Sequence, residues 1–273
     1  MCRLLGVVSN EATDFRFSLH EAPRSLAALS HEHPDGWGLA VHSAGGWELH
    51  KYAACAGIDD RFGPVAATAH GRMLIAHVRK KTVGGSSIAN THPFRQGSWV
   101  FAHNGTIVDR DCLREGAAAA RLAEIRGETD SELFFAFLLT AIDTAGGTDG
   151  AAAAQDAVDE ALTQAVTFLT SRPNLGASNF LLSDGKSLYV HRFGRTLFFL
   201  ERGAGDEVRV SRRSLETDAM VVTPWSVRRN AVLIASEHMT EEPWQELGEK
   251  ALLRIDQSPH PSSTWRFLRR GVL

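Results

Sequence analysis

Residues 1–10 read MCRLLGVVSN and place a cysteine at the start of an apolar segment. Four of residues 4–8 are leucine or valine, which predicts a buried strand. Such a strand does not require a thiol at its first residue. Because methionine aminopeptidase removes the initiator Met when a small residue follows it, we expect the mature chain to begin at Cys2. A nucleophilic thiol and an α-amine that can act as a base would then share one residue at the end of a strand.

Beyond this first strand, hydrophobic periodicity predicts strands early, two long helices in the middle and strands again at the end. The early strands include a glycine-linked hairpin and are expected at 2–9, 37–43, 47–53, 72–79 and 98–105. Helical segments are expected at 15–32, 116–126, 129–142 and 151–171. Seven strand-like runs follow, at 178–185, 187–193, 196–202, 207–211, 219–224, 232–237 and 252–256. Strands and helices segregated in this way predict an α+β fold with largely antiparallel sheets.

Composition excludes several classes of protein. The 273 residues are 44% hydrophobic with a formal net charge of -3, which suits one large globular domain or two small ones and disfavours a nucleic-acid partner. No apolar run is long enough to span a membrane and no signal peptide is evident, so we expect a cytoplasmic protein. Neither GxGxxG after a strand nor GxxxxGK[ST] occurs, which disfavours a dehydrogenase, kinase or NTPase.

The cysteines and histidines predict neither a disulfide framework nor a metal centre. The only other cysteines, Cys55 and Cys112, are far apart and form no CxxC, so we interpret both as structural. His31 and His33 flank a glutamate just before Pro34, and we interpret this stretch as a solvated polar loop. We therefore expect no metal and no organic cofactor.

The stretch VFAHNGTI at 100–107 carries a possible pair of donors. A strand that ends at His103-Asn104-Gly105 would place an amide side chain and an unhindered backbone N–H together at a turn. Those are the donors that an oxyanion hole needs. An Asn-Gly hairpin turn explains the same residues equally well.

Two further segments contain residues that could hold a charged substrate. Arg79 ends an apolar strand, where its guanidinium could clamp a carboxylate with help from the Thr82 hydroxyl, or could simply be exposed. Asp130 could bind an ammonium group, or could cap the helix that follows it. A thiol, an oxyanion hole, a carboxylate clamp and an ammonium anchor together suit an α-amino acid with a side-chain amide. That substrate is glutamine or a γ-glutamyl amide.

The chain as a whole resembles the class II glutamine amidotransferases of the N-terminal nucleophile hydrolase superfamily. No single motif is diagnostic, but their order along the chain is specific. The matching pieces are MC at 1–2, DGWGLA at 35–40, HVRKKT at 77–82, NTHPF at 90–94, HNG at 103–105, ETDSE at 128–132, VLIASE at 232–237 and EPWQEL at 242–247. The resemblance implies a four-layer αββα sandwich of two antiparallel sheets, formed by residues 1–273 as a single domain.

The resemblance also implies a role for each candidate residue. Cys2 is the nucleophile, and Asn104 with the backbone amide of Gly105 forms the oxyanion hole. Arg79, assisted by Thr82, binds the α-carboxylate of glutamine, and Asp130 binds its α-ammonium group. His92 shapes the pocket. The expected chemistry is hydrolysis through a γ-glutamyl thioester, with the α-amine of Cys2 as the proton carrier.

Two departures from the family pattern point to another leaving group. Glu32-His33-Pro34 stands where better-known relatives often have Arg-Gly, and Lys80 stands where they often have an aromatic residue. The ammonia acceptor, if there is one, would be a separate synthase. The alternatives are a γ-glutamyl hydrolase of an ergothioneine-type pathway and a catalytically silent binding or regulatory subunit. An N-terminal nucleophile hydrolase of the proteasome or penicillin-acylase type would leave the Arg79 and Asp130 pair unexplained.

Overall fold

Antiparallel strands form the two main sheets of the fold. The computed structural model describes residues 2–146, 152–203, 212–213, 220–221, 230–258, 261 and 265–271. The first sheet has the order β13-β9-β12-β1-β4-β2-β3, and its strands are β1 (Arg3–Asp14), β2 (Gly36–Ser43), β3 (Gly46–Tyr52), β4 (His70–Arg79), β9 (Phe198–Arg202), β12 (Ala231–Ala235) and β13 (Gln245–Glu246). The second has the order β15-β14-β8-β7-β6-β5, with strands β5 (Phe94–Gln96), β6 (Trp99–Ile107), β7 (Gly176–Ser183), β8 (Ser187–His191), β14 (Leu252–Asp256) and β15 (Arg266–Arg269). A separate two-stranded ribbon pairs β10 (Arg212–Arg213) with β11 (Met220–Val221).

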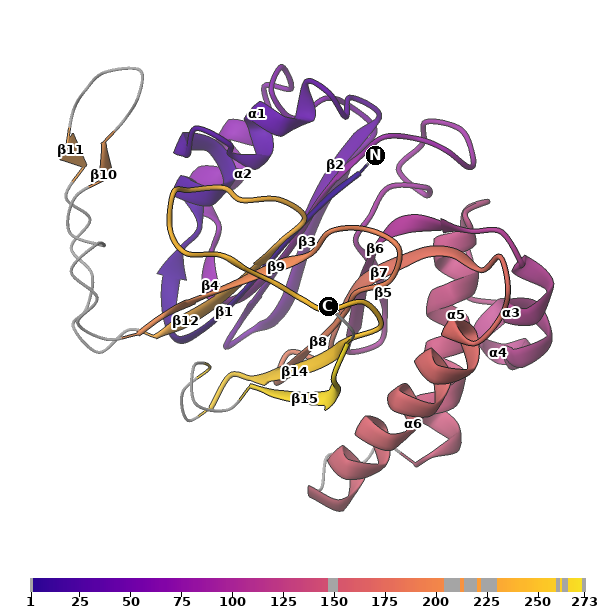
Figure 1. Ribbon diagram of the computed structural model, residues 1–273. Coiled ribbons are helices and arrows are strands. Elements are labelled where there is room, and N and C mark those ends of the chain that lie inside the picture. Colours follow the sequence, from indigo (N-terminus) through magenta and orange to yellow (C-terminus); the bar gives the residue numbers. More distant parts are fainter. Residues whose placement is uncertain are drawn as a thin grey trace.

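Helices cover the outer face of each sheet (Figure 1). The helices are η1 (Phe17–Glu21), α1 (Leu26–Ser30), α2 (Phe62–Thr68), α3 (Arg110–Gly116), α4 (Ala119–Leu122), α5 (Asp130–Thr144) and α6 (Ala152–Thr170). Helices α1 and α2 pack on the first sheet through Leu26 and Phe62. Helices α5 and α6 pack on the second through Phe134 and Leu162. A third apolar cluster fills the space between the sheets. The expected αββα sandwich is therefore confirmed.

Strand alternation decides which side chains face the space between the sheets. In the first sheet, Leu4 of β1, Ile75 of β4 and Ile234 of β12 lie in the cluster between the sheets. In the second sheet, Val100 and Ala102 of β6 do the same. Because side chains two residues apart share a face, the ends of these strands direct further side chains inward. Those side chains belong to Cys2, Arg79, Asn104 and Ser236.

Gly6 of β1 lies close to the side chains of the opposing sheet. A Cβ atom at this position would lie 3.0 Å from Leu181 Cδ1 and 3.2 Å from Leu188 Cδ2, both in the opposing sheet. Glycine therefore sets the local spacing between the sheets, since any side chain would push these leucines away.

Several elements differ from the sequence expectations. The strand expected to end at His103-Asn104-Gly105 continues to Ile107, because β7 pairs with β6 along its whole second half, so these residues form no hairpin turn. The helix expected over 15–32 is split into η1 and α1, and only Ala119–Leu122 of the expected 116–126 helix is helical beyond α3. The strand expected at 207–211 lies outside the described residues. Among the residues that are described, no helix has the length and apolarity to cross a membrane.

Candidate active site

The Cys2 thiol lies against the backbone of Lys80, just after β4. The Lys80 N–H donates to Cys2 Sγ at 3.2 Å, and Sγ lies 3.3 Å from the Lys80 carbonyl oxygen. Burial raises the pKa of the Cys2 thiol, while the Lys80 amide and the Arg79 charge act in the opposite direction. A protonated thiol in this environment needs a base to become a nucleophile.

Arg79 is buried, and its guanidinium holds the loop that follows it. Its Nη2 donates to the carbonyl oxygens of Val83 at 2.8 Å and Gly84 at 3.4 Å, and its Nη1 donates to Gly85 at 3.0 Å. The sequence interpretation of an exposed strand-end arginine is wrong, since the side chain is only 3% exposed. The guanidinium therefore places a buried positive charge at the start of this loop.

Three more contacts fix the same loop. Asp35 Oδ2 accepts the Lys81 N–H at 3.0 Å, and Asp35 Oδ1 accepts from the Ser86 hydroxyl at 3.4 Å. Thr82 Oγ1 lies 3.1 Å from Thr106 Oγ1 on β6. The loop between β4 and β5 is thus tied to both sheets, and Thr82 sits beside the strand that carries Asn104.

Asn104 and Gly105 occupy adjacent positions on β6 and point to opposite faces. Asn104 is buried between the sheets, where its Nδ2 donates to Ser236 Oγ at 3.3 Å. At Gly105 a Cβ atom would lie 1.9 Å from the carbonyl oxygen of Ala177 on β7. Only glycine fits there, which keeps the backbone of β6 unobstructed beside the Asn104 amide.

Asp130 is the first residue of α5, yet its carboxylate does not cap that helix. Thr129 caps it instead, with Oγ1 accepting the Glu132 N–H at 3.3 Å. Asp130 Oδ2 accepts the N–H of Ile107 at 2.6 Å, at the end of β6. The capping interpretation of Asp130 is therefore wrong, and the carboxylate is held beside the strand that carries Asn104 and Gly105.

His92 packs in a cluster of buried imidazoles behind Arg79. Its ring lies 4.3 Å from that of His77, centroid to centroid. Within the described part of the chain, neither ring has a hydrogen-bond partner. Burial lowers the pKa of His92 well below its ordinary value and that of His77 to about 3, so both are neutral near neutral pH. Such rings shape a site and do not carry charge into it.

His33 corrects one sequence interpretation. The stretch before Pro34 was expected to be a solvated polar loop, and His31 and Glu32 are exposed, but the His33 side chain is only 2% exposed. Its pKa is lowered to about 4 by burial and by the positive charges of neighbours such as Arg3 and Lys80. Cys55 and Cys112 are buried free cysteines whose thiols contact Ser30 and the Asp109 carbonyl oxygen respectively, which agrees with a structural role.

Contacts link six of the seven predicted site residues directly or through a neighbouring residue, whereas the ring contacts of His92 are with His77 and Phe94. Cys2 touches the residue after Arg79, Thr82 touches β6, and Asp130 is bonded to the end of β6. Ser236, which the sequence pattern did not single out, completes the circuit by contacting both Asn104 and β1. Its inward direction could have been found from the alternation of β12. A thiol, an amide donor, a buried cation and a carboxylate are thus linked through neighbouring residues, and this set of groups suits acyl transfer on a zwitterionic amide.

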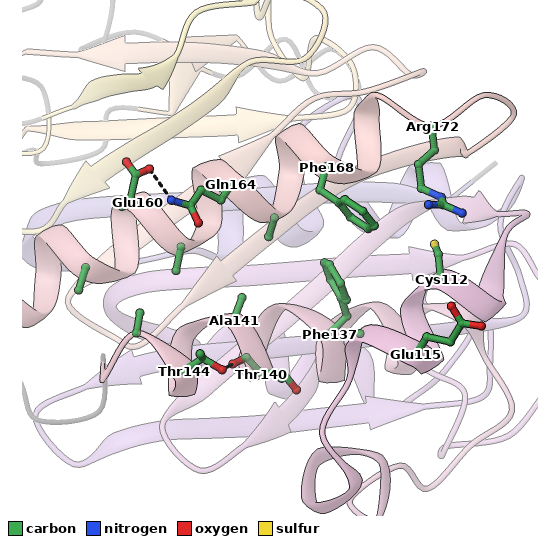
Figure 2. A pocket seen from close by; sticks show the side chains of 15 residues that line it. Cys112, Glu115, Phe137, Thr140, Ala141, Thr144, Glu160, Gln164, Phe168 and Arg172 are labelled. Atoms are coloured by element: carbon green, nitrogen blue, oxygen red, sulfur yellow. Dashed lines mark hydrogen bonds between the residues drawn. The ribbon is translucent and has the colours of Figure 1, made fainter.

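A separate groove lies away from these residues. It has a volume of about 860 Å³ and runs between α5 and α6 on the outside of the sandwich (Figure 2). Phe137 and Phe168 stack at one end, close to Cys112 and Arg172. None of the seven predicted site residues lines it. In the described ranges, no group of three or more His, Cys, Asp or Glu side chains could hold a metal ion.

Comparisons with known proteins match nearly the whole chain to one family. A sequence model of the class II glutamine amidotransferases matches residues 1–259. The protein MJ1515 of Methanocaldococcus jannaschii is 29% identical over 265 residues, which cover 90% of this chain and 66% of the relative. The γ-glutamyl-hercynylcysteine sulfoxide hydrolase of Mycobacterium tuberculosis is 28% identical over 75% of this chain and 82% of its own length.

The chain spans about two thirds of the archaeal relative and 63% of a Haemophilus influenzae relative that is 30% identical. A solved structure, that of a predicted glutamine amidotransferase from Pseudomonas aeruginosa, has a TM-score of 0.63 at 21% identity. The match covers 94% of this chain and 98% of that one, which shows a shared fold.

Proposed function

The chain belongs to the class II glutamine amidotransferases, and we propose that it cleaves the γ-amide of glutamine or of a γ-glutamyl amide through Cys2. The observation that most supports this proposal is the contact circuit that joins Cys2, Arg79, Asn104 and Asp130. The thiol, the amide donor, the cation and the carboxylate come from four elements distant in sequence. Packing alone would not need them to meet.

The proposed reaction begins after Met1 has been removed. The α-amine of Cys2 takes the thiol proton, and the thiolate forms a bond to the γ-carbonyl carbon. The oxyanion accepts hydrogen bonds from the Asn104 amide and the Gly105 N–H. The ammonium then protonates the departing nitrogen, the C–N bond breaks, and a γ-glutamyl thioester remains. Water, deprotonated by the same amine, attacks the thioester, and glutamate and the free thiol are released.

The proposed substrate contacts follow from charge. The Arg79 guanidinium pairs with the α-carboxylate, supplemented by the Thr82 hydroxyl, and the Asp130 carboxylate pairs with the α-ammonium. The neutral His92 ring packs behind Arg79 and fixes the wall of the pocket. Because these contacts recognise the charged groups on the α-carbon, the group attached to the γ-carbonyl can vary.

A larger leaving group than ammonia is the second candidate. The M. tuberculosis relative is named as a hydrolase of a γ-glutamyl conjugate, and the alignment covers 82% of it. In this chain Lys80, whose backbone touches the thiol, replaces the aromatic residue that the family often has. If ammonia is the leaving group instead, a separate synthase is its proposed acceptor. A silent binding subunit remains the non-enzymatic alternative.

The test is glutamate release by the Met1-processed protein from glutamine and from a panel of larger γ-glutamyl amides. The matched control is Cys2→Ala, with Cys55→Ala as a cysteine variant away from the site. Turnover of glutamine that Cys2→Ala abolishes supports an ammonia-supplying glutaminase, and preference for a larger amide supports a γ-glutamyl hydrolase. No Cys2-dependent release from any of these amides would overturn the enzyme proposal in favour of the silent subunit.

A further inference from the structure

Ser236 lies one residue beyond β12 and is joined to β1 by a reciprocal pair of hydrogen bonds. The Leu4 N–H donates to Ser236 Oγ at 2.9 Å, and the Ser236 N–H donates to the Leu4 carbonyl oxygen at 3.1 Å. The register of β1 with β12, in which Leu5 faces Ala235, leads directly into this pair. The hydroxyl of Ser236 is therefore fixed at Leu4, which is two residues after Cys2.

The same hydroxyl also contacts the opposite sheet. Asn104 Nδ2 donates to Ser236 Oγ at 3.3 Å, and both side chains are buried. Among the described residues, Ser236 is the hydrogen-bond partner of the Asn104 side chain. An amide on a short side chain can rotate about its last bond, and it needs a partner to hold one orientation. Ser236 supplies that partner from the sheet that carries the nucleophile.

We infer that Ser236 is a positioning residue that orients the Asn104 amide toward the oxyanion and ties that orientation to the strand of Cys2. This inference rests on the proposed function. With one N–H of the Nδ2 group directed to Ser236, the amide plane is set, and the second N–H points in a defined direction. Donor and nucleophile then keep their relative position although they belong to different sheets. Such preorganisation matters because an oxyanion donor acts only when it is already aimed.

A purely structural role for Ser236 predicts a different outcome. If the hydroxyl served only to join β1 and β12, its removal would lower stability and affect all steps alike. A positioning role acts on the transition state, because the oxyanion exists only there. It should therefore lower kcat with little change in KM, and it should depend on Asn104.

The experiment compares Ser236→Ala, Asn104→Ala and the double variant in Cys2-dependent glutamate release. Loss of an oxyanion donor costs about 100-fold or more in kcat, so a donor that is present but misaimed should cost roughly 10-fold or more. We expect Ser236→Ala to lower kcat to that extent with KM nearly unchanged. We expect it to have almost no further effect in the Asn104→Ala background. Ser236→Thr, which keeps the hydroxyl, should restore most of kcat.

Thr196→Val is the matched structural control. Thr196 Oγ1 donates to the backbone carbonyl of Ser236 at 3.0 Å, so this variant perturbs the same segment without touching the hydroxyl. We expect it to keep kcat. Should Ser236→Ala fail to fold, Ser236→Cys replaces it, because a thiol of similar size is a weak acceptor and predicts the same loss.

Two outcomes separate this inference from the proposed function. Unchanged kcat in Ser236→Ala, or an equal loss in the wild-type and Asn104→Ala backgrounds, overturns the inference alone. Absence of Cys2-dependent release in the wild-type protein overturns the proposed function and the inference with it.

Discussion

Cys2 and Lys80 are joined by two contacts between one sulfur atom and the backbone of one residue, at 3.2 Å to the N–H and 3.3 Å to the carbonyl oxygen. Lys80 is the first residue after β4, so the loop held by Arg79 begins at the thiol. The position of this loop therefore controls the electrostatic environment of the sulfur, and changes to the loop should be measurable at Cys2.

Replacing Arg79 by glutamine should raise the pKa of the Cys2 thiol further. Burial already raises this pKa, and the nearby guanidinium is one of the charges that lower it. The measurement is the pH dependence of Cys2 alkylation in a Cys55→Ser, Cys112→Ser background. Arg95→Gln is the control, since that arginine binds Gly97 and Trp47 carbonyls away from the thiol. An unchanged midpoint pH of Cys2 alkylation in Arg79→Gln would contradict the prediction.

Gly105→Ala should be strongly destabilising. The new Cβ would lie 1.9 Å from the Ala177 carbonyl oxygen, so β6 and β7 would have to move apart. We expect a loss of about 3 kcal/mol or more in the free energy of unfolding, at the upper end of overpacking effects. Chemical denaturation measures it. The control is Gly63→Ala in α2, where nothing lies within 4 Å and helix propensity predicts a neutral or stabilising effect.

Asp130→Asn should weaken substrate binding more than it weakens the fold. An asparagine oxygen can still accept the Ile107 N–H, but the negative charge for the substrate ammonium is gone. A charge-assisted hydrogen bond contributes about 1.5 to 3 kcal/mol, which converts to a KM increase of roughly 10- to 100-fold. Asp109→Asn is the control, because Asp109 caps α3 and pairs with Arg172 away from the site. Equal KM effects in both variants would refute a substrate role for Asp130.

Asp35→Ala should loosen the loop between β4 and β5. It removes the acceptor of the Lys81 N–H at 3.0 Å and of the Ser86 hydroxyl at 3.4 Å. We expect faster amide exchange at Lys81, faster proteolysis within the loop and a higher KM, with the core amides of β4 unaffected. Unchanged exchange at Lys81 would show that Asp35 does not hold the loop.

Acid should destabilise the protein through its buried histidines. His77 has its pKa lowered from 6.5 to about 3, so the unfolded chain binds a proton that the folded chain does not. Stability from this group is complete above pH 6.5 and falls as pH decreases toward 3, by about 1.4 kcal/mol per pH unit. His77→Gln should remove that slope. His191→Gln should remove a similar slope that ends near pH 4, since its pKa is about 4. Stability profiles between pH 7 and 4 that match the wild type in both variants would be incompatible with this mechanism.

Much of the fold could be predicted from the sequence because its elements are locally encoded. The alternation in β2 and β3 with a glycine between them, and the threonine cap before α5, are signals that a short window contains. The continuation of β6 through Asn104 and Gly105 could not be predicted in this way. An Asn-Gly pair favours a turn locally, and only the pairing with β7, more than 70 residues away, overrides it.

The site residues were predicted by chemistry and family resemblance, but their partners were not. Arg79 was identified as a cation, whereas its burial depends on a loop whose carbonyls turn back toward it. Ser236 lies in the family-like segment 232–237, and His33 lies in the stretch interpreted as a solvated loop. The Asn104 contact of Ser236 and the burial of His33 depend on residues distant in sequence, which a local pattern does not encode.

The spacing between the two sheets at Gly6 affects the proposed reaction centre as well as the packing of the core. The nucleophile and one of its proposed oxyanion donors stand on opposing sheets, so the thickness of the hydrophobic layer between them is also a dimension of the reaction centre. A methyl group introduced at Gly6, against Leu181 and Leu188, would push the sheets apart close to Cys2, which immediately precedes β1. Selection for altered turnover in this protein should therefore recover substitutions deep in the core, at positions that never meet a substrate.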